Sequence, residues 1–166
     1  MSTKDFWFPF ERYPDADWNK PNKYFGARRK GTPRLHGGCD LIMPTGTWIH
    51  AVYDGVLVHK ETFFYHNTWY VTYQHGSYLV RYGEIKKGSS TKLEIGDECK
   101  RGEKICKVGQ LSGGDHMLHL EMYTNGKDHS GLRRDPYSKT NKYCRRQDIT
   151  DPGPHLDDWV TRLAPP

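Results

Sequence analysis

The feature that most limits the fold is a series of short β-type runs between residues 34 and 124, separated by turn residues. Asp54-Gly55 and His75-Gly76 have the composition of hairpin turns, and no amphipathic helical pattern lies between the runs. This spacing predicts a mainly β protein, built on an antiparallel sheet or a small sandwich. The runs are 47–65, 68–76, 78–85, 104–111 and 116–123.

The flanking segments have a different character. Residues 1–33 contain four prolines and several aromatic residues, which favours an irregular arm packed on the domain. In residues 155–163, Leu156, Trp159, Val160 and Leu163 fall on one face of a short helix. We therefore expect a single domain with an N-terminal arm (1–33), a core (34–124) and a C-terminal extension (125–166) that contains this helix.

Charge and hydropathy exclude several classes of protein. A net charge of +5 favours a polyanionic partner, but the basic residues are scattered and carry no nucleic-acid-binding motif, so we expect no nucleic-acid partner. No run approaches the roughly 18 apolar residues of a membrane span. Residues 1–10 lack the basic and apolar segments of a secretory signal, so we expect synthesis in the cytoplasm without that signal.

The four cysteines, Cys39, Cys99, Cys106 and Cys144, are widely spaced and form no C-x-x-C pair, which argues against a zinc knuckle. Cys99 and Cys106 bracket a short segment and could pair across a hairpin. Four free, partly buried thiols are the alternative, and both remain open at this point.

Two segments contain residues suited to binding a metal. In "RLHGGCDL" (34–41), His36 and Asp40 are four residues apart, and the intervening glycines let the backbone bend so that both side chains converge. In 116–123, strand alternation places His119 and Glu121 on one face and His116 on the other. A lone histidine in a strand is usually structural, but two such segments in one small domain favour a shared metal site.

Taken in order, these pieces resemble the lysostaphin-type zinc metallopeptidase domain. The resemblance covers about residues 34–124. Its parts are an H-x-x-x-D pair, a P-x-G-T strand segment, a Tyr-bearing strand in 78–85, a G-D hairpin, and a final strand that carries His119. It implies that His36, Asp40 and His119 bind one zinc ion and leave a fourth position for water. Two histidines, one carboxylate and an open position are sound chemistry for a zinc hydrolase.

The chain departs from the family pattern at two positions. Glu84 and Met117 stand where the family usually has two catalytic histidines. In one interpretation Glu84 is the general base, Tyr82 reaches the site from the same strand face, and His116 supports the oxyanion if a bulge turns it inward. In the other, the metal site is a structural or ligand-binding relic, and Glu84 is solvated or a fourth ligand.

Glu121 also has two interpretations. It can orient a metal-bound histidine as a hydrogen-bond acceptor, or it can pair with a basic residue across the sheet. Neither makes it a ligand.

The resemblance implies a zinc-dependent endopeptidase that cleaves peptide cross-links of bacterial peptidoglycan, with stem peptides lying in a groove lined by Tyr65, Tyr70, Tyr78 and Tyr123. We expect it to act in the periplasm or wall of a target cell, as an antibacterial effector carried by a secretion system or as a phage-associated lytic enzyme. An immunity protein, a secretion component or a phage tail component would then be a partner. The alternative is a non-catalytic module that binds or assembles on the wall and retains the fold and metal site.

Overall fold

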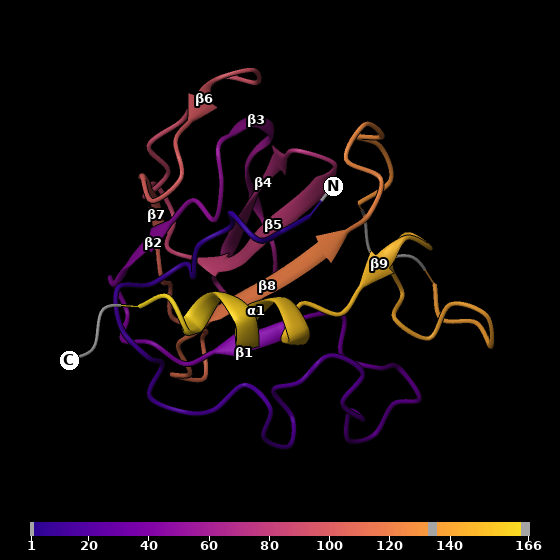
Figure 1. Cartoon of the computed structure of the whole chain (residues 1–166). Helices are drawn as coiled ribbons and strands as arrows, with labels where there is room; N and C mark the ends of the chain where they lie inside the picture. Colours follow the sequence, from indigo (N-terminus) through magenta and orange to yellow (C-terminus); the bar gives the residue numbers. More distant parts are fainter. Residues whose placement is uncertain (1, 133–135, 164–166) are drawn as a thin grey trace.

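The computed structural model describes residues 2–132 and 136–163, and an antiparallel sheet is its central element (Figure 1). The strand order in this sheet is β1-β8-β5-β4-β3-β6, and β9 pairs with β8. A separate pair joins β2 and β7. The predicted mainly β, antiparallel architecture is therefore confirmed. The strands are β1 (Cys39–Leu41), β2 (Trp48–His50), β3 (Gly55–Phe63), β4 (Trp69–His75), β5 (Tyr78–Ile85), β6 (Glu98–Cys99), β7 (Lys104–Lys107), β8 (Leu118–Tyr123) and β9 (Ile149–Thr150).

Two of the predicted runs differ in detail from the observed strands. The run 47–65 is divided, because β2 leaves the main sheet to pair with β7 while β3 pairs with β4 and β6. Asp54-Gly55 therefore lies at the start of β3 and does not join two paired strands. The turn at Gly76 does connect β4 to β5, and Gly76 has a positive φ of 59° there.

Strand alternation gives the main sheet two different faces. Cys39, Leu41, Leu118 and Leu120 point to the principal hydrophobic core and are fully buried. The residues between them on β1 and β8, Asp40 and His119, point to the opposite face. The apolar half of the pattern thus forms the core, and the polar half is gathered on one side of the same strands.

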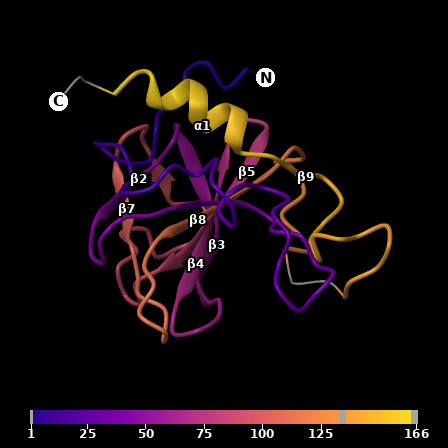
Figure 2. The ribbon, with the colours of Figure 1, turned by 90° about the horizontal axis from the view of Figure 1, so that it is seen from below.

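The N-terminal arm and the single helix in the described residues cover the core face. Helix α1 (Gly153–Val160) lies beside the N-terminal end of the arm (Figure 2), and it buries Leu156, Trp159 and Val160. The arm packs beside it: Trp159 Nε1 donates a hydrogen bond to the carbonyl of Thr3 at 3.1 Å, and the Phe6 and Trp159 rings lie 5.4 Å apart. No helix in the described segments is long and apolar enough to cross a membrane.

All four cysteines are buried, free thiols. Cys99 and Cys106 lie on different strands, β6 and β7, and do not pair. The alternative with four free thiols is therefore the one that the structure shows.

Candidate metal centre

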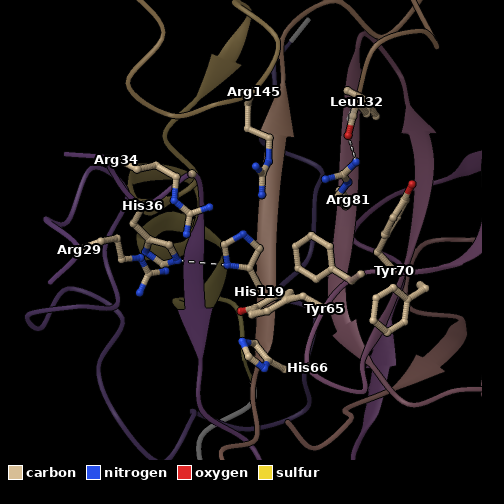
Figure 3. Close-up of a pocket in the computed structure, with 13 residues that line it drawn as sticks. Arg29, Arg34, His36, Tyr65, His66, Tyr70, Arg81, His119, Leu132 and Arg145 are labelled. Carbon is tan, nitrogen blue, oxygen red and sulfur yellow. Dashed lines mark hydrogen bonds between the residues drawn. The ribbon is translucent and has the colours of Figure 1, made fainter. Parts of the chain in front are cut away.

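Three side chains converge on the polar face of the sheet. His36 precedes β1, Asp40 lies on β1, and His119 lies on β8, where it is the direct cross-strand partner of Asp40. His119 Nδ1 lies 2.8 Å from Asp40 Oδ1, and His36 Nε2 lies 3.1 Å from both of these atoms. Figure 3 shows the contact between His36 and His119. The structure thus brings together the three residues that the sequence predicts as metal ligands, all of them buried.

The hydrogen bonds of the two histidines fix which ring nitrogen faces the cluster. His36 Nδ1 donates to the carbonyl of Tyr24 at 3.0 Å, so Nε2 presents a lone pair to the cluster. His119 Nε2 donates to Glu121 Oε1 at 3.0 Å, so Nδ1 presents its lone pair. A carbonyl or carboxylate behind each histidine is the usual support of a metal-binding imidazole.

The donor set fits a cation. Two imidazole lone pairs and a carboxylate oxygen within 3.1 Å of one another repel unless a positive charge lies between them. The pKa values of His119 and Asp40 reflect this requirement for a positive charge. Burial alone would lower the pKa of His119, yet its contacts with Asp40 and Glu121 raise it to about 9, and both histidines hold the pKa of Asp40 below its usual range despite burial. A metal ion supplies the same positive charge, and nitrogen and oxygen ligands of this kind suit zinc.

Gly38 allows β1 and β8 to approach closely beside this cluster. A Cβ atom at this position would lie 2.4 Å from the carbonyl oxygen of Leu120 and 3.0 Å from the ring of His119. Both contacts are too short for any side chain. The glycine between His36 and Asp40 is therefore required by the packing of the ligands, in addition to bending the chain.

Glu84 reaches the same face through a bulge in β5. Trp69 pairs with Ile85 and Tyr70 pairs with Gly83, so Glu84 is an extra residue without a partner on β4. It has a positive φ of 59°, which interrupts strand alternation and turns the side chain over. Its carboxyl group feels the charges of His119 and Asp40, although Glu84 is not one of the three residues whose ligand atoms lie within 4.8 Å of one another.

The carboxyl group of Glu84 is nearly completely buried, with a relative exposure of 1%. Burial raises its pKa to about 7, the nearby charge of His119 lowers it, and that of Asp40 raises it again. The hydroxyl group of Tyr65 donates a hydrogen bond to Oε1. Oε2 is buried and has no hydrogen-bond partner among the described residues, so it is the oxygen of this carboxyl group that the protein does not already engage.

Two predicted catalytic residues lie elsewhere. Tyr82 was expected on the same face as Glu84, but it is the cross-strand partner of Leu120 and points into the core, because the bulge separates it from Glu84. Its hydroxyl group accepts a hydrogen bond from the Val52 backbone at 3.1 Å and lies 2.9 Å from His75 Nε2. His116 precedes β8, its Nδ1 donates to the carbonyl of Met43 at 2.7 Å, and it is not among the described residues that line the cavity.

Glu121 fulfils both functions that the sequence left open. It accepts the hydrogen bond from His119, and it pairs across the sheet with Arg81 at 3.3 Å. Arg145, from the C-terminal extension, donates to Oε1 at 3.0 Å, and the Tyr123 hydroxyl donates to Oε2 at 2.7 Å. These donors keep the pKa of the fully buried carboxyl group well below its usual range, despite burial that would raise it.

Two of the three candidate ligands, His36 and His119, line a cavity of about 370 Å³. Tyr65 and Tyr70 line it as predicted for the groove, whereas Tyr123 is buried against Glu121 and Tyr78 packs against Phe6. The sequence also left four arginines unassigned. Arg29 lies in a basic run at 27–30, but irregular segments have no periodicity that places a side chain. The cavity is lined by Arg29, Arg34, His36, Gly37, Phe63, Phe64, Tyr65, His66, Tyr70, Arg81, His119, Leu132 and Arg145.

Comparisons with known proteins agree with this geometry. An uncharacterized metalloprotease from Buchnera aphidicola is 35% identical over 124 residues, which are 72% of this chain and 31% of that protein. Peptidoglycan DD-endopeptidase ShyA from Vibrio cholerae is 31% identical over 133 residues, covering 75% of this chain and 29% of that protein. The chain thus spans about three tenths of the length of these curated relatives.

The fold is similar to that of the catalytic domain of the antimicrobial peptidase lysostaphin from Staphylococcus simulans. The TM-score is 0.60 at 19% sequence identity, covering 84% of this chain and 92% of that domain. The model of peptidase family M23 matches residues 34–130, more than half of the chain. With the fold and the donor set in agreement, the chain belongs to peptidase family M23.

Proposed function

We propose that this protein is a zinc-dependent endopeptidase that cleaves peptide cross-links in bacterial peptidoglycan. The observation that carries the proposal is the buried carboxyl group of Glu84, which the bulge in β5 places beside a three-ligand metal cluster. Membership of a zinc-dependent peptidase family and a relative named as a peptidoglycan endopeptidase support it.

One zinc ion would be held by His36 Nε2, Asp40 Oδ1 and His119 Nδ1. Bound there, it would polarise a peptide carbonyl and lower the pKa of a water molecule toward about 7. The chain positions the ligand atoms through the Tyr24 carbonyl behind His36 and the Glu121 carboxylate behind His119.

Glu84 supplies the general base in this proposal. Its Oε2 accepts the proton from the attacking water and later gives it to the departing amine, while Tyr65 holds Oε1 by a hydrogen bond. A pKa raised by burial makes this carboxyl group a stronger base than an exposed glutamate. Phe64, Tyr65 and Tyr70 provide an aromatic wall for the stem peptide.

The experiment compares Glu84→Gln with wild type. Muropeptide analysis by mass spectrometry should show new peptide ends after digestion by the wild-type protein, and the variant should cleave at least about 100-fold more slowly. Zinc content should stay at one per chain in both, because Glu84 is outside the ligand set. Glu98→Gln, an exposed position on β6, is the control and should behave as wild type.

A non-catalytic wall-binding module is the second candidate, and the absence of both usual catalytic histidines, at Glu84 and Met117, favours it. It would be established if wild-type protein binds zinc and pellets with peptidoglycan but releases no new muropeptide ends, and if Glu84→Gln binds the wall equally well.

The place of action is a separate part of the proposal. Segments 145–152 and 155–159 resemble extensions in phage and secreted-effector members of the family, which supports delivery to the wall of a target cell and the existence of an immunity partner. Directing the protein to the periplasm of a Gram-negative host should lyse the cells, whereas the same protein kept in the cytoplasm should not. Equal toxicity from both compartments would contradict this part.

A further inference from the structure

The wall of the cavity beside the metal cluster is strongly cationic. Four arginines line it, Arg29, Arg34, Arg81 and Arg145, and none of its described lining residues is an aspartate or a glutamate. The carboxyl groups of Asp40, Glu84 and Glu121 lie beneath this surface, where they are engaged with histidines, arginines or Tyr65.

Two of the arginines are committed to the protein. Arg81 bonds with Glu121 and with the carbonyl of Leu132, and its guanidinium group stacks on Tyr70 at 4.2 Å. Arg145 bonds with Glu121 and with the carbonyl of Cys144. Glu121 offsets only one of their two positive charges, but both guanidinium groups are held by it and serve mainly to hold that carboxylate.

Arg29 is different. It comes from the N-terminal arm, is half-buried, and forms no side-chain hydrogen bond or ion pair with the described residues, whereas Arg81 and Arg145 each bond with Glu121. Its Nε atom, like that of Arg81, is shielded from solvent without a partner. Figure 3 shows it beside His36. It lines the same cavity as His36 and Tyr65. A half-buried guanidinium group without a partner is unfavourable, and a bound carboxylate would satisfy it.

The cavity is also divided by chemistry. Arg29 and Arg34 stand on the His36 side, and Tyr65 and Tyr70 stand on the other (Figure 3). A peptide that crosses the ligand cluster therefore meets Arg29 and Arg34 on one side of the scissile bond. On the other side it meets aromatic rings and Arg81, whose guanidinium group stacks on Tyr70 and already bonds with Glu121. The cationic side selects a negative charge, and the planar fork of arginine suits a carboxylate.

We propose that Arg29 binds a free carboxylate on the substrate residue next to the scissile amide, so that the cleft selects peptides that carry this carboxylate over those with a carboxamide. The inference rests on the proposed function for the identity of the substrate as a stem peptide. In such peptides the carboxylate belongs either to the side chain of the diamino acid or to the terminal alanine.

The test measures binding before it measures cleavage. Zinc-loaded protein is titrated calorimetrically with uncross-linked stem peptides in three forms: unmodified, amidated on the diamino acid, and amidated at the terminal alanine. We expect one of the two amides to bind about tenfold more weakly than the unmodified peptide. The amide that loses affinity identifies the carboxylate that Arg29 recognises.

Arg29→Gln should bind the unmodified peptide about tenfold more weakly than wild type does, and it should bind all three peptides with the same affinity. Arg29→Lys should recover part of the preference for the unmodified peptide. Arg28→Gln removes the same charge from an exposed neighbour and should retain the wild-type preference. Thermal melts show whether each variant is folded. Equal binding of all three peptides by wild type, or an equal loss for all three in Arg29→Gln, would overturn the proposal.

Muropeptide cleavage separates this inference from the function on which it rests. If the carboxylate preference is present but no bond is cut, the enzyme proposal fails and Arg29 is a recognition residue of a binding module. If cross-links are cut with no such preference, the enzyme proposal stands and the assignment of Arg29 fails.

Discussion

Glu84 reaches the three candidate metal ligands because its own backbone has a left-handed conformation within β5. The sequence identifies the carboxyl group by its position in the family pattern, but alternation along a regular strand would place it with Tyr82 on the core face. The bulge reverses this orientation. Gly83 precedes it, yet nothing in the residue types specifies a bulge, so the residue can be predicted but the face to which it points cannot.

The environment of Tyr82 leads to a prediction about stability. Tyr82→Phe should lower the free energy of unfolding by about 1–2 kcal/mol, because His75 Nε2 and the Val52 amide lose their common partner in the core. Urea denaturation measures this loss. The rate constant for cleavage by the folded variant should stay at the wild-type value, and a large fall in that rate without a loss of stability would restore Tyr82 as a catalytic residue.

At the scale of secondary structure elements, the pairing of β1 with β8 builds the site. The register makes Asp40 the partner of His119, and His36, just before β1, lies beside both. Two segments distant in sequence are thereby brought together by a short stretch of backbone pairing. The orientation of the ligands depends on how closely these two strands approach.

Gly38→Ala tests this dependence. The added methyl group would lie 2.4 Å from the carbonyl oxygen of Leu120, so β1 must move away from β8. We expect a loss of at least about 2 kcal/mol in stability, typical of overpacking, and at least about tenfold weaker zinc binding in competition with a chelator.

Gly113→Ala is the matched control, because a Cβ atom there meets nothing within 4 Å and the residue has no positive φ. It should retain wild-type zinc affinity and stability. Wild-type zinc affinity in Gly38→Ala would show that the cluster tolerates separation of the two strands.

On the scale of the whole molecule, the site draws on segments outside the family core. The arm supplies Arg29 and the Tyr24 carbonyl, and the extension supplies Arg145. The sequence predicts the sheet through its alternating runs and brings His36 and Asp40 together through their spacing. It does not place these outer contributions, because irregular segments follow tertiary contacts that no local pattern records.

Acid stability should depend on His75, a fully buried residue at the end of β4. Burial lowers its pKa to about 4 from the usual 6.5, and backbone carbonyls and the exposed Asp54 oppose this only in part. Above pH 6.5 the residue is neutral in both states. Between pH 6.5 and about 4 only the unfolded chain takes up the proton, so stability should fall by up to about 3 kcal/mol, and His75 adds no further loss below pH 4.

Urea titrations between pH 7 and 4 measure this change. His75→Gln has no group to titrate at this position, so its free energy of unfolding should fall less over the same pH range. The difference between the two falls is the contribution of His75. Parallel pH profiles for the variant and wild type would assign the acid sensitivity to other groups.

The contact between the arm and helix α1 also determines when the site can be completed during synthesis. Thr3 and Phe6 bond to residues of the C-terminal segment, Trp159 and Arg162, while the same arm carries the Tyr24 carbonyl that orients His36. A ribosome delivers the arm before the helix on which it docks. The nascent chain can pair its strands early, but the arm is fastened, and the metal ligands are fully oriented, only after the helix has emerged.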